Sequence, residues 1–240
     1  MGVIMSTSLI SFHKDRLTED TFFDIARGCY RDAIHFNKFG YIGSVGTSDE
    51  TVWDGGGLYS YPTTATVASI SGTEPAGTTV NVQGLDQDFN LIDENIEVGS
   101  SGSLTFIRIF RVRLVTHTGG LNTNDIDITV DGAVRAKILA GKGQSLMAVL
   151  TVPKGYTGYL CQLQGSMEKQ KEVLFTLLSK HEALNGVFSV KGKFGSFGVP
   201  VTYDYKIPLA FEEKTDIEVR AKAGATTGIG VVFDMVLLKN

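Results

Sequence analysis

Cysteine is scarce in this chain, and it has no long hydrophobic run. Only two of the 240 residues are cysteine, Cys29 and Cys161, so the fold cannot depend on a disulfide framework. This usage suits assembly in a reducing compartment, with the two thiols either free or joined in a single bridge. No segment approaches the ~20 consecutive apolar residues of a transmembrane helix. The first residues lack the basic start and apolar run of a signal peptide. We therefore expect no membrane partner and no secretion by that route.

Positive charge is also in short supply. The chain has 22 lysines and arginines against 26 acidic residues, a net charge of -4. This balance argues against a nucleic-acid partner held by a broad basic surface. A hydrophobic content of 42% and a charged content of 20% are ordinary for a globular protein with a real core. The 28 glycines, against only 5 prolines, indicate many turns between short apolar runs rather than disorder.

Local signatures of catalysis are missing. The chain has no HExxH or GxSxG motif, and its glycine-rich stretches lack the residues of a Walker or Rossmann phosphate loop. The histidines are scattered, and none is paired at metal-ligand spacing: His13, His35, His117 and His181. We expect a protein that is not an enzyme, with no catalytic residue and no cofactor.

A polar loop at residues 116–124 is followed by three aspartates, which raises the question of calcium. Asp125, Asp127 and Asp131 do not follow the acidic-Gly-Glu order of an EF-hand loop. Asp125 and Asp127 are better explained as the wet face of a strand. The sequence therefore predicts no metal site.

Short runs of alternating apolar and polar residues dominate the chain. The clearest example is the stretch 79–115, where strand-like runs are separated by polar linkers that contain glycine, aspartate and serine. Such linkers are typical hairpin connectors. Successive side chains of a strand point to opposite faces, so each run has one dry and one wet face. The predicted fold is an all-β, two-sheet antiparallel β-sandwich, jelly-roll-like. Pro208 interrupts one run and argues for an edge position or a bulge there.

The domain organisation follows from shifts in this pattern. We expect residues 1–45 to form an N-terminal anchor segment, within which 18–34 is either a short helix or an extended arm. Residues 46–240 would form the sandwich. If the sandwich divides into two sub-sandwiches, the boundary lies at a charged break at 165–172.

The run 104–115 is irregular. Arg108 falls on the face that otherwise carries Leu104 and Phe106, so either both faces are partly covered or a β-bulge near Ile109 shifts the phase. Arg108, Arg111 and Arg113 form a basic cluster. It is either a contact with an anionic partner or a charged strand face that discourages edge pairing. Together with the aromatic cluster that begins at Phe36, it supplies the candidate subunit contacts: Phe36, Lys38, Phe39, Arg108, Arg111 and Arg113.

The only tryptophan lies beside three consecutive glycines. The segment 51–62 places Trp53, Tyr59 and Tyr61 around Gly55, Gly56 and Gly57. One interpretation is a platform on which a carbohydrate stacks. The other is a tight turn whose aromatic side chains anchor it to the sandwich.

The order of several short motifs resembles that of β-sandwich virion structural proteins of tailed bacteriophages. The resemblance covers residues 37–240. It implies a non-enzymatic component of the particle, assembled in the bacterial host cytoplasm, with other virion proteins and copies of itself as partners, in a capsid-decorating, collar or tail-associated position. The motifs that carry it are Asn37-Lys38-Phe39-Gly40, Trp53-Asp54-Gly55-Gly56 with a Tyr-Pro step, Val82-Gln83-Gly84-Leu85-Asp86, Phe106-Ile107-Arg108 with Arg111-Val112, Val152-Pro153-Lys154-Gly155-Tyr156, and Lys214-Thr215-Asp216-Ile217.

Overall fold

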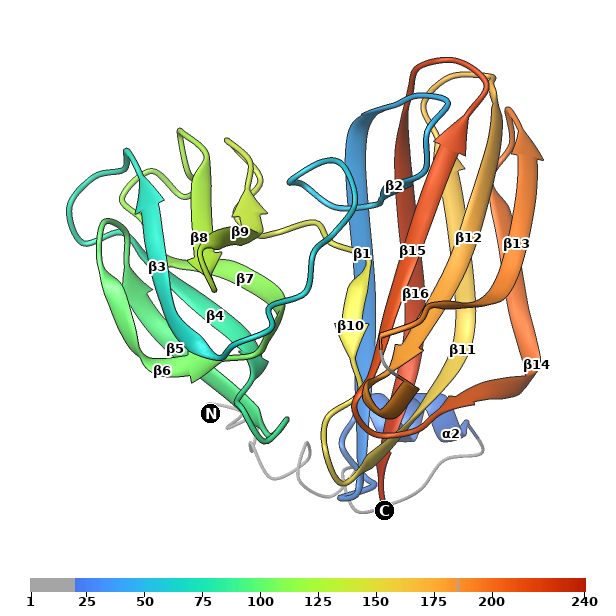
Figure 1. Ribbon diagram of the computed structural model, residues 1–240, viewed down its shortest axis with the longest axis horizontal. Helices are drawn as coiled ribbons and strands as arrows, with labels where there is room; N and C mark the ends of the chain where they lie inside the picture. The colour runs from blue at the N-terminus through green and yellow to red at the C-terminus, as the bar shows by residue number, and fades with distance from the viewer. Residues whose placement is uncertain (1–19, 185) are drawn as a thin grey trace, which may run out of the picture.

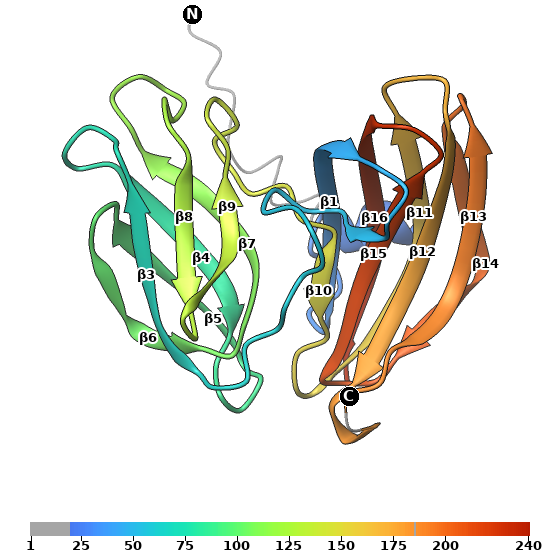
Figure 2. The same cartoon turned by 45° about the horizontal axis from the view of Figure 1, so that its top comes forward.

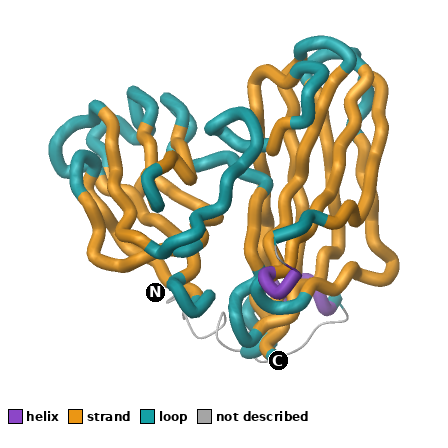
Figure 3. The backbone as a smooth tube through the Cα atoms, viewed as in Figure 1, coloured by secondary structure: helices purple, strands orange, loops and turns teal. Residues whose placement is uncertain are grey.

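The fold is all-β, as predicted. A computed structural model describes residues 20–184 and 186–240, and strands make up 60% of the chain against 4% for helices. Every strand pair in the described residues is antiparallel. The strands form four sheets, which pack as two sandwiches side by side (Figures 1 and 2). The sequence predicted one sandwich, with a division into two near 165–172 as an alternative. Loops are confined largely to the ends of the strands (Figure 3).

The large sandwich contains both ends of the described chain. Its core includes Phe175, Phe233 and Leu160, which are all but inaccessible to solvent. The first sheet has the order β1 (Ala33–Val45), β16 (Thr227–Lys239), β11 (Tyr156–Met167) and β14 (Val201–Phe211). The second has the order β10 (Val149–Thr151), β15 (Thr215–Ala223), β12 (Glu172–His181) and β13 (Ser189–Phe197), with β2 (Glu50–Thr51) paired to β15. A 3-10 turn, η1 (Glu182–Leu184), follows β12.

The small sandwich is inserted between β2 and β10 and has a core of its own around Phe106, Ile109 and Ile128. One sheet has the order β6 (Ser101–Phe106), β3 (Thr66–Gly72), β8 (Ile126–Val130) and β9 (Ala133–Ile138). The other has the order β5 (Leu91–Glu97), β4 (Thr79–Leu85) and β7 (Arg108–Thr116).

The chain enters and leaves the small sandwich at one place. The Ala148 N–H donates to the Val52 carbonyl at 2.8 Å, and Trp53 forms a β-bridge with Met147. The insertion therefore begins and ends on neighbouring strands.

The irregular run 104–115 proves to be two strands in different sheets. β6 ends at Phe106 and β7 begins at Arg108, so the chain crosses from one sheet of the small sandwich to the other at Ile107. The predicted bulge is also confirmed: Gln83 pairs with Arg111 and Gly84 with Ile109, which leaves Phe110 as an extra residue. These two features change the direction of the side chains and turn Arg108 toward the large sandwich.

The N-terminal segment agrees with the prediction in one respect, because a short helix lies within 18–34. The helix α2 spans only Thr21–Ala26 and is capped by Asp20, whose carboxylate accepts from the Phe23 N–H at 3.1 Å. Residues 33–45 are not an anchor segment but the edge strand β1, which pairs with β16 along most of its length. Apolar residues such as Ile42 and Val45 hold this strand on the core. The part of the predicted arm at 1–19 lies outside the described residues.

The charged break at 165–172 is not a boundary between sub-sandwiches. It connects β11 to β12, which belong to the two facing sheets of the large sandwich. Solvent-exposed residues in this turn, Glu168, Lys169 and Gln170, account for its polar composition. A polar turn within one sandwich and a linker between two have the same composition, which explains the wrong prediction.

Both alternatives for Pro208 hold at once. β14 is the edge strand of its sheet. Its pairing with β11 stops at Asp204 opposite Gln162 and resumes at Leu209 opposite Leu160, so the four residues 205–208 form a large irregular bulge opposite Cys161. A residue without an N–H donor is tolerated in such a place.

Candidate functional site

A cluster of buried charged side chains lies where the small sandwich meets the large one. β7 runs along the side of the small sandwich that faces β10 (Figures 1 and 2). Arg108 begins this strand, and its side chain meets Asp216 of β15. We call the cluster the joint; its members are Tyr61, Arg108, Thr151, Lys180, Asp216, Glu218 and Arg220.

Asp216 is the centre of the joint and is only 1% exposed. Its carboxylate accepts from Arg108 Nε at 2.7 Å and from Arg108 Nη2 at 3.0 Å, a bidentate pair. Thr151 Oγ1 donates at 2.6 Å, and Lys180 Nζ lies 3.2 Å away. The remaining Arg108 nitrogen, Nη1, donates to the carbonyls of Pro62 and Ile107. Both charges are thus fully engaged within the chain.

Aromatic rings enclose the cations of the joint. The guanidinium of Arg108 lies 5.1 Å from the centre of the Tyr61 ring and 5.3 Å from that of Phe89. Lys180 Nζ lies 4.1 Å from the Tyr61 ring and 5.1 Å from the Phe188 ring, which Arg220 also covers at 4.8 Å. Such contacts favour a desolvated cation electrostatically. They also exclude water from the ion pairs.

Burial and pairing compete in setting the pKa values of the joint. Burial alone would lower the pKa of Arg108, but the hydrogen bonds and charge of Asp216 outweigh it and raise that pKa. Burial raises the pKa of Glu218, although Arg220 and the Tyr61 hydroxyl, which donates to Glu218 at 3.1 Å, oppose this effect. Burial also raises the pKa of Tyr61 far above its ordinary value, with Glu218 adding to the effect.

A second contact between the sandwiches involves β1. Lys38 is 2% exposed, and its ammonium donates to the Phe110 carbonyl. The Phe36 ring meets the Phe110 ring edge to face, with 5.5 Å between centroids. Arg111 Nη2 donates to the Asn37 carbonyl at 2.6 Å. Burial lowers the pKa of Lys38, and the nearby charge of Arg111 lowers it further.

The structure assigns most of the candidate subunit contacts to this intramolecular interface. Phe36, Lys38, Arg108 and Arg111 join the two sandwiches of one chain. Lys38 and Arg108 are buried there, and Phe36 and Arg111 are half-buried. The other two lie apart. Phe39 is half-buried on β1 opposite Val232, and Arg113 is exposed on β7 opposite Asn81.

The structure also overturns the stacking-platform interpretation. Trp53 and Tyr59 are buried, at 6% and 5% exposure, and Tyr61 is half-buried with its hydroxyl on Glu218. The three rings pack edge to face in series, with centroids 5.1 and 4.9 Å apart. The Trp53 indole donates to the Gly56 carbonyl at 3.0 Å. The aromatic side chains therefore anchor the glycine turn and extend to the joint.

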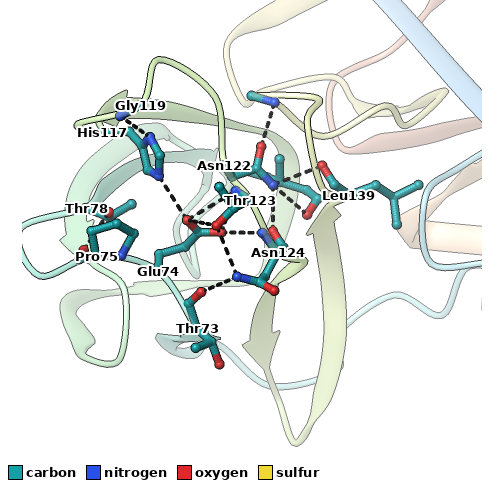
Figure 4. A network of polar contacts seen from close by, with 12 residues as sticks. Thr73, Glu74, Pro75, Thr78, His117, Gly119, Asn122, Thr123, Asn124 and Leu139 are labelled. Carbon is teal, nitrogen blue, oxygen red and sulfur yellow. Dashed lines mark hydrogen bonds and ion pairs between the residues drawn. The ribbon is translucent and has the colours of Figure 1, made fainter.

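The polar loop 116–124 is organised by a carboxylate that the sequence analysis did not identify. Glu74 accepts from the backbone N–H groups of Thr123 and Asn124 at 2.9 and 2.6 Å, and lies 2.9 Å from His117 Nε2 (Figure 4). The Asn122 amide donates to the Leu139 carbonyl at 2.9 Å. Burial would raise the pKa of Glu74, but the hydrogen bonds from Asn124 and Thr123 lower it overall. The loop is closed by its own side chains.

The aspartates near this loop have partners within the chain. Lys137 Nζ lies 3.4 Å from Asp125 and 2.9 Å from Asp127. Asp131 accepts from the Thr63 N–H at 2.8 Å. Over residues 20–184 and 186–240, no group of three or more His, Cys, Asp or Glu could hold a metal ion.

The buried polar side chains of the joint are paired within the chain. None of its side-chain polar atoms is both buried and without a partner. Sequence reasoning found Arg108 because it interrupts a core face. It missed Asp216 and Glu218, which alternate with apolar residues in the same way as a solvated strand face does. Only the need of a core-facing arginine for a carboxylate could have pointed to them.

Comparisons with known proteins provide no family for the chain. No protein-family model matches it, and no curated protein matches its sequence significantly. Within the described residues, no helix combines the length and the apolar character needed to cross a membrane.

Proposed function

We propose that this chain is a non-enzymatic structural component of a tailed-phage virion. It reinforces or decorates the capsid, or the collar or tail region, through contacts with other virion proteins and with copies of itself. The observation that carries the proposal is that the buried charges of the joint are used in pairing. Asp216 binds Arg108 and Lys180, and Glu218 binds Arg220 and the Tyr61 hydroxyl. The order of the motifs described above adds support.

The proposed mechanism is passive. The ion pairs of the joint and the Phe36–Phe110 contact fix the small sandwich against the large one, so the two behave as one body. A load on one sandwich is passed to the other through side chains with little conformational freedom. A rigid subunit of this kind strengthens an assembly by occupying several neighbours at once, without a change of shape.

The test is the presence and the effect of the protein in purified particles. Particles from a culture that carries the gene are labelled with an antibody against the folded protein and examined by electron microscopy. We expect labels at repeated, symmetry-related positions. A non-structural protein of the same genome, expected only in the lysate, is the control. Detection of this protein in the lysate but on no particle would refute the proposal.

A second measurement tests reinforcement. Particles made without this protein should lose their genome at a lower temperature or under milder osmotic shock than complete particles, and addition of the purified chain should restore resistance. Equal resistance of the two kinds of particle would contradict a reinforcing role.

A receptor- or carbohydrate-binding role would need another surface. The alternative function relied on Trp53, Tyr59 and Tyr61 as an exposed stacking face, and these rings are enclosed by the chain.

A further inference from the structure

Exposed apolar side chains gather along one side of the large sandwich. This is the side where its two sheets end, in β13 and β14. Ile207 is 85% exposed and Phe197 is 70% exposed, although both are large apolar side chains. Contiguous exposed apolar surface marks interaction sites. The exposed apolar residues of this side are Val187, Val190, Phe197, Val199, Tyr203 and Ile207.

The outer edge of β14 has no strand beside it in the part of the chain that the structure describes. The bulge also releases residues 205–208 from the ladder with β11. An unpaired strand edge is a template for pairing with another chain. The middle of β14 thus offers backbone groups and apolar side chains together.

The centre of β14 has a self-complementary sequence. Residues 203–207 read Tyr-Asp-Tyr-Lys-Ile. If two copies align antiparallel with Tyr205 at the centre, Asp204 of each copy lies opposite Lys206 of the other, and Tyr203 lies opposite Ile207. Directly opposed residues of antiparallel strands interact, and opposite charges or apolar pairs at such positions are favourable.

We propose that a second copy of this chain binds along β14, with the two strands antiparallel about a two-fold axis at Tyr205. The contact joins the two sheets that contain β14 into one sheet across the dimer. It is isologous and closes at two copies. It names one partner for the assembling role proposed above. Because it is tested in solution, its failure would leave the virion proposal standing.

Charge selects this alignment over its neighbours. An axis at Asp204 would bring two carboxylates together, and an axis at Lys206 would bring two ammonium groups together. The other edge strand, β13, is protected: alignment about Gly192 would oppose Lys191 to Lys193. Lysine and proline on an edge strand often prevent pairing with another chain. In this alignment Lys206 lies opposite a carboxylate of the second copy. Pro208 lies opposite Thr202, near the end of the paired segment.

The experiment is a charge swap. The full chain is compared with Asp204→Lys, Lys206→Asp and the double variant by sedimentation equilibrium over a wide concentration range. Each single variant places like charges opposite each other twice in the dimer, so we expect the dimer dissociation constant to rise about tenfold or more. The double variant recreates both attractive pairs and should return the constant to near that of the unaltered chain.

The restored double variant separates pairing from folding. Asp204 also accepts from the Gln162 amide within its own chain, and this bond is lost in the single Asp204→Lys variant and in the double variant alike. Rescue in the double variant can therefore arise only between copies. Lys193→Glu on β13 is the matched control, and it should not change the dissociation constant. Circular dichroism verifies that each variant is folded.

Three results would overturn the proposal. One is a chain that stays monomeric at all concentrations, and another is an oligomer other than a dimer. The third is a dimer whose dissociation constant does not respond to the single reversals or is not restored by the double one. An Ile207→Ser variant gives an independent measure: it should weaken the dimer while leaving the stability of the monomer unchanged, because this side chain is already in water in the monomer.

Discussion

The ion pair between Arg108 and Asp216 makes a quantitative prediction about how the two sandwiches are held together. Asp216→Asn keeps the shape of the side chain but leaves the guanidinium of Arg108 and the ammonium of Lys180 without the carboxylate they share. Removing one member of a buried ion pair costs about 3–5 kcal/mol because the other charge stays buried. We expect Asp216→Asn to lower the free energy of unfolding by that amount. Arg108→Met should lower it by less, because Asp216 keeps its contact with Lys180.

The double variant tests whether the effect belongs to the pair. When both residues are replaced, no guanidinium is left without its carboxylate, so the loss should be well below the sum of the single losses. Residues in contact commonly show coupling of ~0.5–3 kcal/mol, and full burial places this pair in the upper part of that range. Chemical denaturation supplies all four free energies of the cycle.

Two spectroscopic signals report on different parts of the molecule during this unfolding. Circular dichroism follows all strands, whereas fluorescence follows the single tryptophan, Trp53, whose ring is linked to the joint through Tyr59 and Tyr61. If the joint couples the sandwiches, both signals change together in the unaltered chain and separate in Asp216→Asn. A loss below about 1 kcal/mol in Asp216→Asn, or strictly additive single effects, would refute this reasoning.

Four further variants test individual features. Burial lowers the pKa of Lys38, so the unfolded chain binds the proton more tightly and the stability of the unaltered chain should rise with pH toward 10.5. Lys38→Met should abolish this rise and stabilise the fold at neutral pH. Thermal melts over a range of pH measure both effects. Burial raises the pKa of Asp54 to about 7 from 3.8, so stability should fall as pH rises through that interval, and Asp54→Asn should remove the fall; a flat profile in the unaltered chain would contradict it. Gly40→Ala should lower the free energy of unfolding by several kcal/mol, because a Cβ would lie 2.2 Å from the Val52 carbonyl oxygen. An unchanged denaturation midpoint would show that β1 can move away from Val52. Trp53→Ala should cost about 3–5 kcal/mol by leaving a cavity, and a normal stability would mean that the ring is not packed as described.

The sequence predicted the fold class correctly for a simple physical reason. Alternation with period two is a local property, and it marked strands such as β4 and β8 because their inner faces are apolar. The position of Pro208 was also readable, since the missing N–H limits where a proline can lie in a sheet. Both conclusions depend on a few neighbouring residues.

The division into two sandwiches was not readable, because it depends on which sheet each strand joins. The run 104–115 looks in the sequence like one irregular strand, yet the chain crosses between sheets at Ile107. The joint is likewise non-local: Arg108 and Asp216 are 108 positions apart, and the surroundings of Asp216 resemble any half-exposed strand. The sequence showed that Arg108 was unusual, but not what it binds.

The position of the insertion has a consequence for how this molecule can vary. Because the chain enters the small sandwich next to Val52 and returns next to Met147, on strands that are already bridged, a different module of any length can occupy that place while the strand order of the large sandwich stays the same. A replacement must have its two ends close together and must pair Asp216 with a cation. It must also cover the apolar surface of the large sandwich that Leu85, Phe89, Ile107 and Phe110 cover here. The large sandwich is in this sense a fixed frame, and the inserted module can change in surface and size without altering it.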